Sequence, residues 1–283
     1  MLASLLIVFR EVFEAGLIVG LILAATEGVT GRGRWIAGGV LAGSLGATVV
    51  AGFAAAIAEA LEGVGQEVFT AAILIVAVAM LGWHNTWMAR HGREMAREMS
   101  AVGRAVKGGE RSLLALAVVV AVAVLREGSE VALFLYGIAA SIHAGPAPML
   151  AGGGIGLLLA ALVSFLLYRG LVAIPLRNLF AVTNWLIALL AAGMAGQAAA
   201  VLASADILPS WGDHLWNTSF LLSEDSWAGS ALHALIGYSA RPSGVQVAAY
   251  ATTLLVLVGL ARFAAQSTPA RTAPSDNVNS SHP

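Results

Sequence analysis

Long apolar segments recur along this chain, and seven of them reach the length of a membrane-spanning helix. They are residues 3–26, 35–58, 67–88, 113–139, 148–168, 180–203 and 245–264. A helix needs about 20 mostly apolar residues to cross the hydrocarbon core of a bilayer. Here the apolar residues stand in continuous blocks and do not alternate with polar ones, as they would in half-buried strands. The pattern predicts an all-α integral membrane protein with seven transmembrane helices in a single domain, residues 1–265.

Two of the connections between these segments are long. Residues 89–112 are basic, and we expect them to form a partly helical loop. Residues 204–244 contain several tryptophans and acids, which is typical of a segment at the level of the lipid headgroups. Residues 266–283 consist mainly of Ser, Thr, Pro and Asn without an apolar pattern, which predicts a disordered tail.

Composition supports the membrane assignment and narrows the chemistry. The chain has 283 residues, of which 59% are hydrophobic and only 11% are charged. Soluble domains carry roughly 25% charged residues. The absence of cysteine excludes disulfides, thiolate metal sites and the usual haem attachment motif. The first apolar segment has no basic leader and carries charges where a signal peptide is apolar, so we expect a retained transmembrane helix.

Basic residues in the connections predict how the chain is oriented. They follow the first, third, fifth and seventh apolar segments, as Arg32, Arg34, Arg90, Arg93, Arg97, Arg104, Lys107, Arg111, Arg169, Arg177, Arg262 and Arg271. The other connections are acidic, with Arg241 as their one base. Since Lys and Arg accumulate on the cytoplasmic side, the N-terminus is predicted to lie outside and the C-terminus in the cytoplasm.

Two of the apolar segments carry the same polar motif. "FREVFEAGLIVG" (residues 9–20) contains Arg10, Glu11 and Glu14, and "LREGSEVALFLYG" (residues 125–137) contains Arg126, Glu127 and Glu130. Each charge at the centre of a spanning helix costs about 2.5–3.5 kcal/mol on insertion scales. Because a helix turns about 100° per residue, each motif forms one polar stripe about 100° wide. The two stripes are therefore expected to face each other inside the bundle.

The predicted orientation makes the two motif helices antiparallel. Residues 3–88 and 113–203 then form two inverted three-helix repeats, followed by the last helix at 245–264. Transporters built in this way bind substrate near the bilayer midplane, where the repeats meet. A second pattern occurs in both halves, as Gly39-x-x-x-Gly43 and Gly152-x-x-x-Gly156. This spacing lets helix backbones approach closely.

The charges of the two motifs do not balance. Arg10 can reach Glu14 one turn on, and Arg126 can reach Glu130, which leaves one glutamate of each motif without a cation. A purely structural network of ion pairs is the alternative, but it would more naturally be balanced. Carboxylate oxygens suit hard cations, and oxygen ligation alone does not separate iron from manganese, magnesium or calcium. The residues by themselves predict a permease for a hard metal cation.

The motifs "REVFE" and "REGSE" in a seven-helix chain resemble the oxidase-dependent iron transporter family, the high-affinity iron permeases of fungi and bacteria. The family pattern is Arg-Glu-Gly-Leu-Glu, so this chain departs from it at the middle positions. "SEDSWAGSALHALIGY" also resembles the stretch before the last helix of the family. The resemblance implies iron transport into the cytoplasm, across a bacterial inner membrane, through a site made of Glu11, Glu14, Glu127 and Glu130, supported by Arg10 and Arg126.

The resemblance also implies an outer collection point for iron. Glu59-x-x-Glu62 resembles an external Glu-x-x-Glu motif of the family, and the acids predicted on this side are Glu59, Glu62, Glu67, Glu224 and Asp225. A solvated helix connection is the alternative interpretation of these acids. His84, predicted near the inner end of the third segment, is either an exit ligand or an interfacial packed residue.

Iron is expected to be a transported substrate, with no permanently bound cofactor. The expected partners are the lipid bilayer and a separate extracytoplasmic iron oxidase or iron-binding protein; no nucleic acid is expected. Nucleotide loops, nucleophile motifs and metal-hydrolase spacings are missing from the sequence, so an enzyme is not predicted. Two alternatives remain open: a permease for another cation such as lead or manganese, and a membrane scaffold whose ion pairs are structural.

Overall fold

The computed structural model describes residues 1–60, 66–141, 146–170, 176–212, 214–224 and 226–266. Within these ranges the chain forms helices and no strands, which confirms the all-α prediction. The helices are α1 (Leu2–Ala25), α2 (Arg32–Ala60), α3 (Gln66–Lys107), α4 (Leu113–Ser141), α5 (Pro146–Tyr168), α6 (Leu176–Ser204), α7 (Trp227–Ile236) and α8 (Gly244–Gln266). The predicted disordered tail beyond residue 266 lies outside the described residues.

Five of these helices are long and apolar enough to cross a membrane, namely α2, α3, α5, α6 and α8. The two motif helices, α1 and α4, are of similar length, but each contains the three charged residues of its motif. Their ability to span therefore depends on how these charges are satisfied inside the protein. The total of seven spans stays a prediction.

The structure differs from the predicted elements in two places. α3 has 42 residues and continues to Lys107, so most of the predicted loop at 89–112 is helical. This segment is rich in Ala, Met, Arg and Glu and lacks Pro, a composition that favours a helix. α7 is an additional helix of ten residues within the predicted headgroup-level segment. Ser226 caps its start and Gly237, with a φ of 68°, ends it; at 1.5 Å per residue it is too short to span a bilayer.

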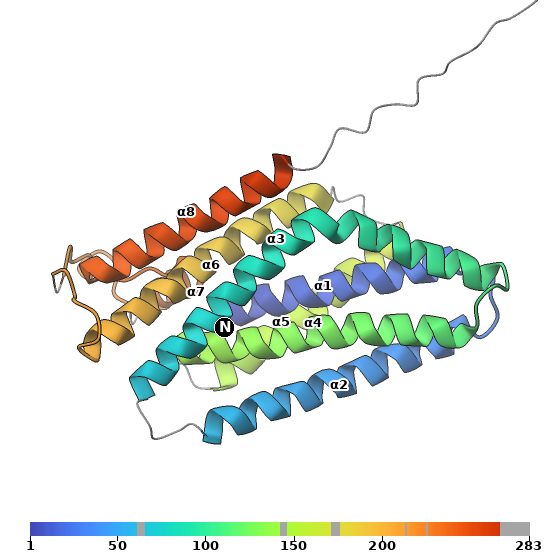
Figure 1. Ribbon diagram of the computed structural model, residues 1–283, viewed down its shortest axis with the longest axis horizontal. Helices are drawn as coiled ribbons and strands as arrows, with labels where there is room; N and C mark the ends of the chain where they lie inside the picture. The colour runs from blue at the N-terminus through green and yellow to red at the C-terminus, as the bar shows by residue number, and fades with distance from the viewer. Residues whose placement is uncertain (61–65, 142–145, 171–175, 213, 225, 267–283) are drawn as a thin grey trace, which may run out of the picture.

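Helices from opposite halves of the chain pack against each other. α2 lies along α4 at one side of the molecule, and α5 lies along α1 (Figure 1). α3 packs on α6, and α8 covers the other face of α6. The motif helices α1 and α4 also contact each other. Each motif helix is thus braced by the glycine-containing helix of the other half.

The glycines of α2 bring it into backbone contact with α4. A Cβ atom added at Gly39 would lie 2.5 Å from the carbonyl oxygen of Ala117, and one at Gly43 would lie 2.6 Å from that of Ala121. The two carbonyls precede Arg126 by nine and five positions. The predicted close approach of helix backbones is therefore present here, on the side of α4 that leads into its motif.

The glycines of α5 make the same contact with α1. A Cβ atom at Gly156 would lie 2.5 Å from the carbonyl oxygen of Leu5, and one at Gly152 would overlap with that of Met1. These carbonyls precede Arg10 by the same two intervals, nine and five positions. The shared register is the pattern that two inverted repeats would produce, although the repeat itself stays a prediction.

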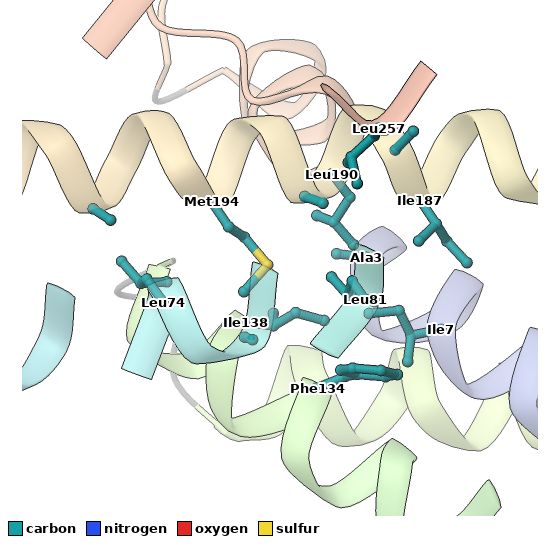
Figure 2. Close-up of a cluster of buried hydrophobic side chains, with 14 of the residues drawn as sticks. Ala3, Ile7, Leu74, Leu81, Phe134, Ile138, Ile187, Leu190, Met194 and Leu257 are labelled. Carbon is teal, nitrogen blue, oxygen red and sulfur yellow. The ribbon is translucent and has the colours of Figure 1, made fainter. Parts of the chain in front are cut away.

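Two apolar clusters lie on either side of the motifs. Figure 2 shows the first, in which α1, α3, α4, α6 and α8 contribute Ala3, Ile7, Leu74, Leu81, Phe134, Ile138, Ile187, Leu190, Met194 and Leu257. The second is formed by Ile18, Ile22, Ile36, Val106, Leu116 and Val120. Along both α1 and α4, the motif residues come between the residues of the first cluster and those of the second. The charges therefore form a polar layer between two apolar layers.

Gly39→Ala is expected to destabilise the protein, because the new methyl group would meet the α4 backbone. Overpacking of this kind costs about 1–3 kcal/mol. The neighbouring Gly38 is the matched control, since a Cβ atom there has nothing within 4 Å. Thermal unfolding of the purified variants in detergent should show a lower melting temperature for Gly39→Ala and no decrease for Gly38→Ala. Equal melting temperatures would contradict the close contact of α2 and α4.

Candidate metal site

The motif of α1 is wholly buried. Arg10, Glu11 and Glu14 are 1%, 0% and 3% exposed. The Arg10 Nε lies 3.0 Å from Glu14 Oε1, and its Nη1 lies 3.4 Å from Glu11 Oε1. Arg10 is therefore enclosed between the two carboxylates of its own helix. The expected pairing of Arg10 with Glu14, one turn apart, is present.

The motif of α4 is arranged differently. Arg126 Nε lies 3.2 Å from Glu130 Oε1, again one turn apart, but the Arg126 side chain is 32% exposed. Its guanidinium stacks on the ring of Trp87 from α3, with 4.2 Å between Cζ and the ring centroid. A guanidinium over an aromatic face is attracted by the ring quadrupole. The two motifs therefore have the same sequence pattern but unequal surroundings, with Arg10 enclosed and Arg126 accessible.

Glu127 is a buried carboxylate without a hydrogen-bond partner. Its exposed fraction is 2%, and neither carboxylate oxygen has a hydrogen-bond donor in the described part of the chain. The nearest cation, Arg126 Nε, is 3.8 Å from Glu127 Oε1, beyond hydrogen-bond range. A buried charge of this kind is strongly unfavourable unless it is paired or binds a metal ion. Glu127 is thus the residue of the two motifs that most needs a cation.

His84 of α3 lies between the two motifs. It is buried, and its Nε2 is 3.6 Å from Glu11 Oε2 and 3.7 Å from Glu14 Oε2. Its Nδ1 is in direct contact with Glu130 Oε2. The apolar run that ends at residue 88 predicts His84 near the inner end of the membrane-spanning part of α3, and the candidate span is Glu67–Met88. α3 itself continues for about five turns beyond this span, so His84 lies well inside the helix.

Three of the four predicted glutamates gather with His84 into a group that fits one ion. One ligand atom each from Glu11, His84, Glu127 and Glu130 lie within 4.8 Å of one another. Atoms on opposite sides of a first-row metal ion are about 4 Å apart, since each bond is about 2 Å long. The fourth predicted ligand, Glu14, is outside this group and contacts Arg10 and His84 instead.

Two pockets reach this group from different sides. One, of about 650 Å³, lies between α3 and α4 and is lined by Trp83, His84, Trp87, Arg126 and Glu130 among others. The second, of about 570 Å³, lies between α1, α2, α4 and α5. It is lined mainly by apolar side chains, with Glu127, Ser44, Ser164 and Tyr168 as polar groups. The buried carboxylates are therefore adjacent to two separate openings.

The predicted outer acids are distributed over several elements. Glu67 is exposed in the first turn of α3, and Glu59 belongs to the last turn of α2. Glu224 is exposed, and its Oε1 accepts hydrogen bonds from the Ala240 backbone N–H at 2.5 Å and from the Ser239 hydroxyl at 3.1 Å. Glu62 and Asp225 lie outside the described residues. Glu224 therefore already links two parts of the segment between α6 and α8.

Comparisons with known proteins give a consistent result. The model of the family described as "Iron permease FTR1 family" matches residues 1–267. The protein named "Ferrous iron permease EfeU" from Escherichia coli O6:H1 is 33% identical over 254 residues, which cover 88% of this chain and 91% of that protein. The protein of the same name from Yersinia pestis is 30% identical over 254 residues, covering 88% and 89%. No solved structure matches the chain.

The unequal surroundings of the two arginines predict unequal effects of removing them. Arg10→Gln would leave Glu11 and Glu14 buried without their cation, and breaking a buried pair in this way costs about 3–5 kcal/mol. Arg126→Gln should cost less, because that side chain is only partly buried. Melting temperatures in chelator-treated detergent solution should therefore fall further for Arg10→Gln, and adding Glu14→Gln to it should recover part of the loss. Equal decreases for the two single variants would contradict the asymmetry.

Proposed function

The chain belongs to the iron permease FTR1 family, and we propose that it carries iron into the cytoplasm through the site between α1 and α4. Its membership and its relatives' names support iron transport across a membrane by a multi-pass protein. The relatives are named as ferrous iron permeases, which favours Fe²⁺ as the substrate here. We further propose that the chain acts as a transporter and not as an enzyme, in a bacterial inner membrane.

The observation that carries the proposal is the buried carboxylate of Glu127, which lies beside three other ligand side chains and forms no hydrogen bond in the described part of the chain. A structural network of ion pairs would satisfy each buried charge closely, but the one cation next to Glu127 is Arg126, at 3.8 Å. The motifs contain four carboxylates and two guanidinium groups, so they carry a surplus of negative charge when all of them are ionised. A divalent cation next to Glu11, Glu127 and Glu130 would neutralise this surplus. The charge imbalance therefore supports an ion site more than it supports a scaffold.

The two arginines have different roles in the proposed mechanism. Arg10 is enclosed and keeps Glu14 and one oxygen of Glu11 in position while the ion is bound or absent. Arg126 is accessible and pairs with Glu130, so it can leave that carboxylate when the ion arrives and remain stacked on Trp87. The ion thus replaces the guanidinium of Arg126 at Glu130.

The arrangement of the helices supports a route and a direction. We propose that α1 and α4 span together with the five apolar helices, with the basic ends of α1, α3 and α5 toward the cytoplasm. Lys and Arg in the connections support this orientation through the positive-inside rule. The pocket next to Glu127 is also lined by Leu23 and Tyr168, which belong to the basic ends of α1 and α5. Iron would leave the site through this pocket when the α1–α5 and α2–α4 pairs move apart.

The acids near the predicted outer ends of the helices and an external partner would supply the iron. Glu59, Glu62 and Glu67 would collect iron at the outer ends of α2 and α3, together with Glu224 and Asp225. A separate iron oxidase or iron-binding protein would deliver the metal there. These roles rest on the resemblance of the motifs to those of the family, and they are independent of the buried site.

Glu127→Gln is expected to lower iron uptake by more than about tenfold, since loss of even a group that only supports a metal ligand costs 10- to 100-fold. The amide keeps the volume of the side chain and removes the charge that requires a cation. The measurement is uptake of radioactive iron under reducing conditions into proteoliposomes that contain only this chain. Glu27→Gln, at an exposed position just beyond α1, is the matched control and should transport normally.

Normal uptake by Glu127→Gln at equal protein content would rule out the buried carboxylates as the ion site. Reduced uptake by both variants would point instead to a general effect of surface or buried charge on the protein. The prediction is met only if the buried variant fails and the exposed one does not.

A further inference from the structure

α3 contributes a nitrogen donor to a site that both motifs supply with oxygen alone. The side chain of His84 contacts Glu11 and Glu14 of α1 on one side of its ring and Glu130 of α4 on the other. It is 3% exposed, so its donors and acceptors have no access to bulk water. Among the described residues, it is the one histidine that belongs to a group of possible metal ligands.

We infer that His84 is a direct ligand of the transported ion and that it makes the site select ferrous iron over harder divalent cations. The inference rests on the proposed function for the identity of the cargo. It goes beyond that proposal because the paired motifs account for the oxygen ligands only. With His84, the ion is held by three helices in place of two.

The position of His84 is determined by the packing of α3. Leu74, Ala77 and Leu81 are buried on α3 at positions ten, seven and three before His84, so all four share one face of the helix. Leu74, Ala77 and Leu81 belong to the first apolar cluster, which holds this face against α6 (Figure 2). The His84 ring also meets the edge of Phe134, with 6.4 Å between centroids. The imidazole is therefore held at the ion site without free rotation into solvent.

Both ring nitrogens of His84 have the surroundings that a metal-binding histidine needs. A histidine that binds a metal through one nitrogen usually donates the proton of its other nitrogen to a carboxylate, which fixes the orientation of the ring. Carboxylates lie next to both nitrogens of His84. Either nitrogen can therefore face the ion while the other donates to a glutamate.

The chemistry of the donor atoms links His84 to selectivity. Carboxylate oxygens suit Mg²⁺, Ca²⁺ and Mn²⁺, whereas imidazole suits iron and the later transition metals. A site of glutamates alone would discriminate poorly between Fe²⁺ and these abundant hard cations. One imidazole added to three carboxylates stabilises bound Fe²⁺ relative to bound Mg²⁺, Ca²⁺ or Mn²⁺.

The test is metal competition in the uptake assay with His84→Gln, which replaces the nitrogen by a neutral oxygen donor of similar size. Half-inhibition of iron uptake by Mn²⁺ and by Mg²⁺ is measured for wild type and variant, together with the iron concentration for half-maximal uptake. In His84→Gln we expect the iron concentration for half-maximal uptake to rise at least about tenfold. We also expect half-inhibition at a lower ratio of Mn²⁺ or Mg²⁺ to iron than in wild type. The competitor-to-iron ratio is measured on a single protein sample. It therefore does not depend on the fraction of the protein that is correctly folded.

Two further variants make the result specific. His214→Gln is the control, since His214 is exposed in the segment between α6 and α8, and its selectivity should equal that of wild type. His84→Cys introduces the single thiol of the chain at the site. Thiolate favours soft metals, so Cd²⁺ should become a stronger inhibitor of this variant. This gain is expected only if the side chain at position 84 faces the ion.

Co²⁺ binding to the purified protein in detergent gives a readout that is independent of transport. Replacing a nitrogen ligand by oxygen should change the visible absorption of bound Co²⁺ in His84→Gln but not in His214→Gln. If the wild type transports iron and His84→Gln shows the same Co²⁺ spectrum, or the same selectivity for iron over manganese, as wild type, the role of His84 is overturned. A wild type that transports no iron would overturn the proposed function itself.

Discussion

A buried carboxylate that forms no hydrogen bond is the feature on which the rest of this protein depends. Glu127 lies in a layer of charged side chains between two apolar clusters, and water is largely excluded from it. In such surroundings a carboxyl group either takes up a proton or needs a cation close to it. Glu11, Glu130 and His84 each place a ligand atom close to Glu127.

The packing of the helices explains how so many charges can be brought together. α1 and α4 meet at their motifs, and each is braced from behind by a helix whose glycines contact its backbone. These contacts lie at the same sequence distance from the motif in the α1–α5 pair and in the α2–α4 pair. Carboxylates of α1 and α4 then come together between the helices. The two motifs differ, however, in the surroundings of their arginines. Arg10 is enclosed, whereas Arg126 lies on a pocket and stacks on Trp87, so the site combines a fixed half with an adjustable one.

Much of this arrangement could be predicted from the sequence, because membrane insertion imposes strong rules on composition. Long apolar runs gave the helices, and the high cost of charge in lipid showed that the motif residues must face inward. The glycine spacing correctly predicted close contacts, and the motifs indicated a family that the comparisons confirm. The number of spans and the inverted repeat remain predictions from charge and topology.

The parts that sequence analysis missed depend on packing across the bundle. Hydropathy ends the third membrane-spanning segment at residue 88, as it does in the structure, but helix propensity carries α3 on to Lys107. A single histidine in an apolar segment gives no sign of which neighbours it will meet. The spacing of His84 and Trp87, three residues apart on one helix face, was the available signal. Only the packing of α3 against α4 reveals that both residues reach the second motif.

The most direct test of the account is the location of iron itself. Crystals of the protein soaked in Fe²⁺ under reducing conditions can be measured at the iron absorption edge, where the anomalous signal marks iron alone. The account predicts a peak enclosed by the carboxylates of Glu11, Glu127 and Glu130. A peak elsewhere in the protein, with Glu127 instead paired to a protein group, would contradict it.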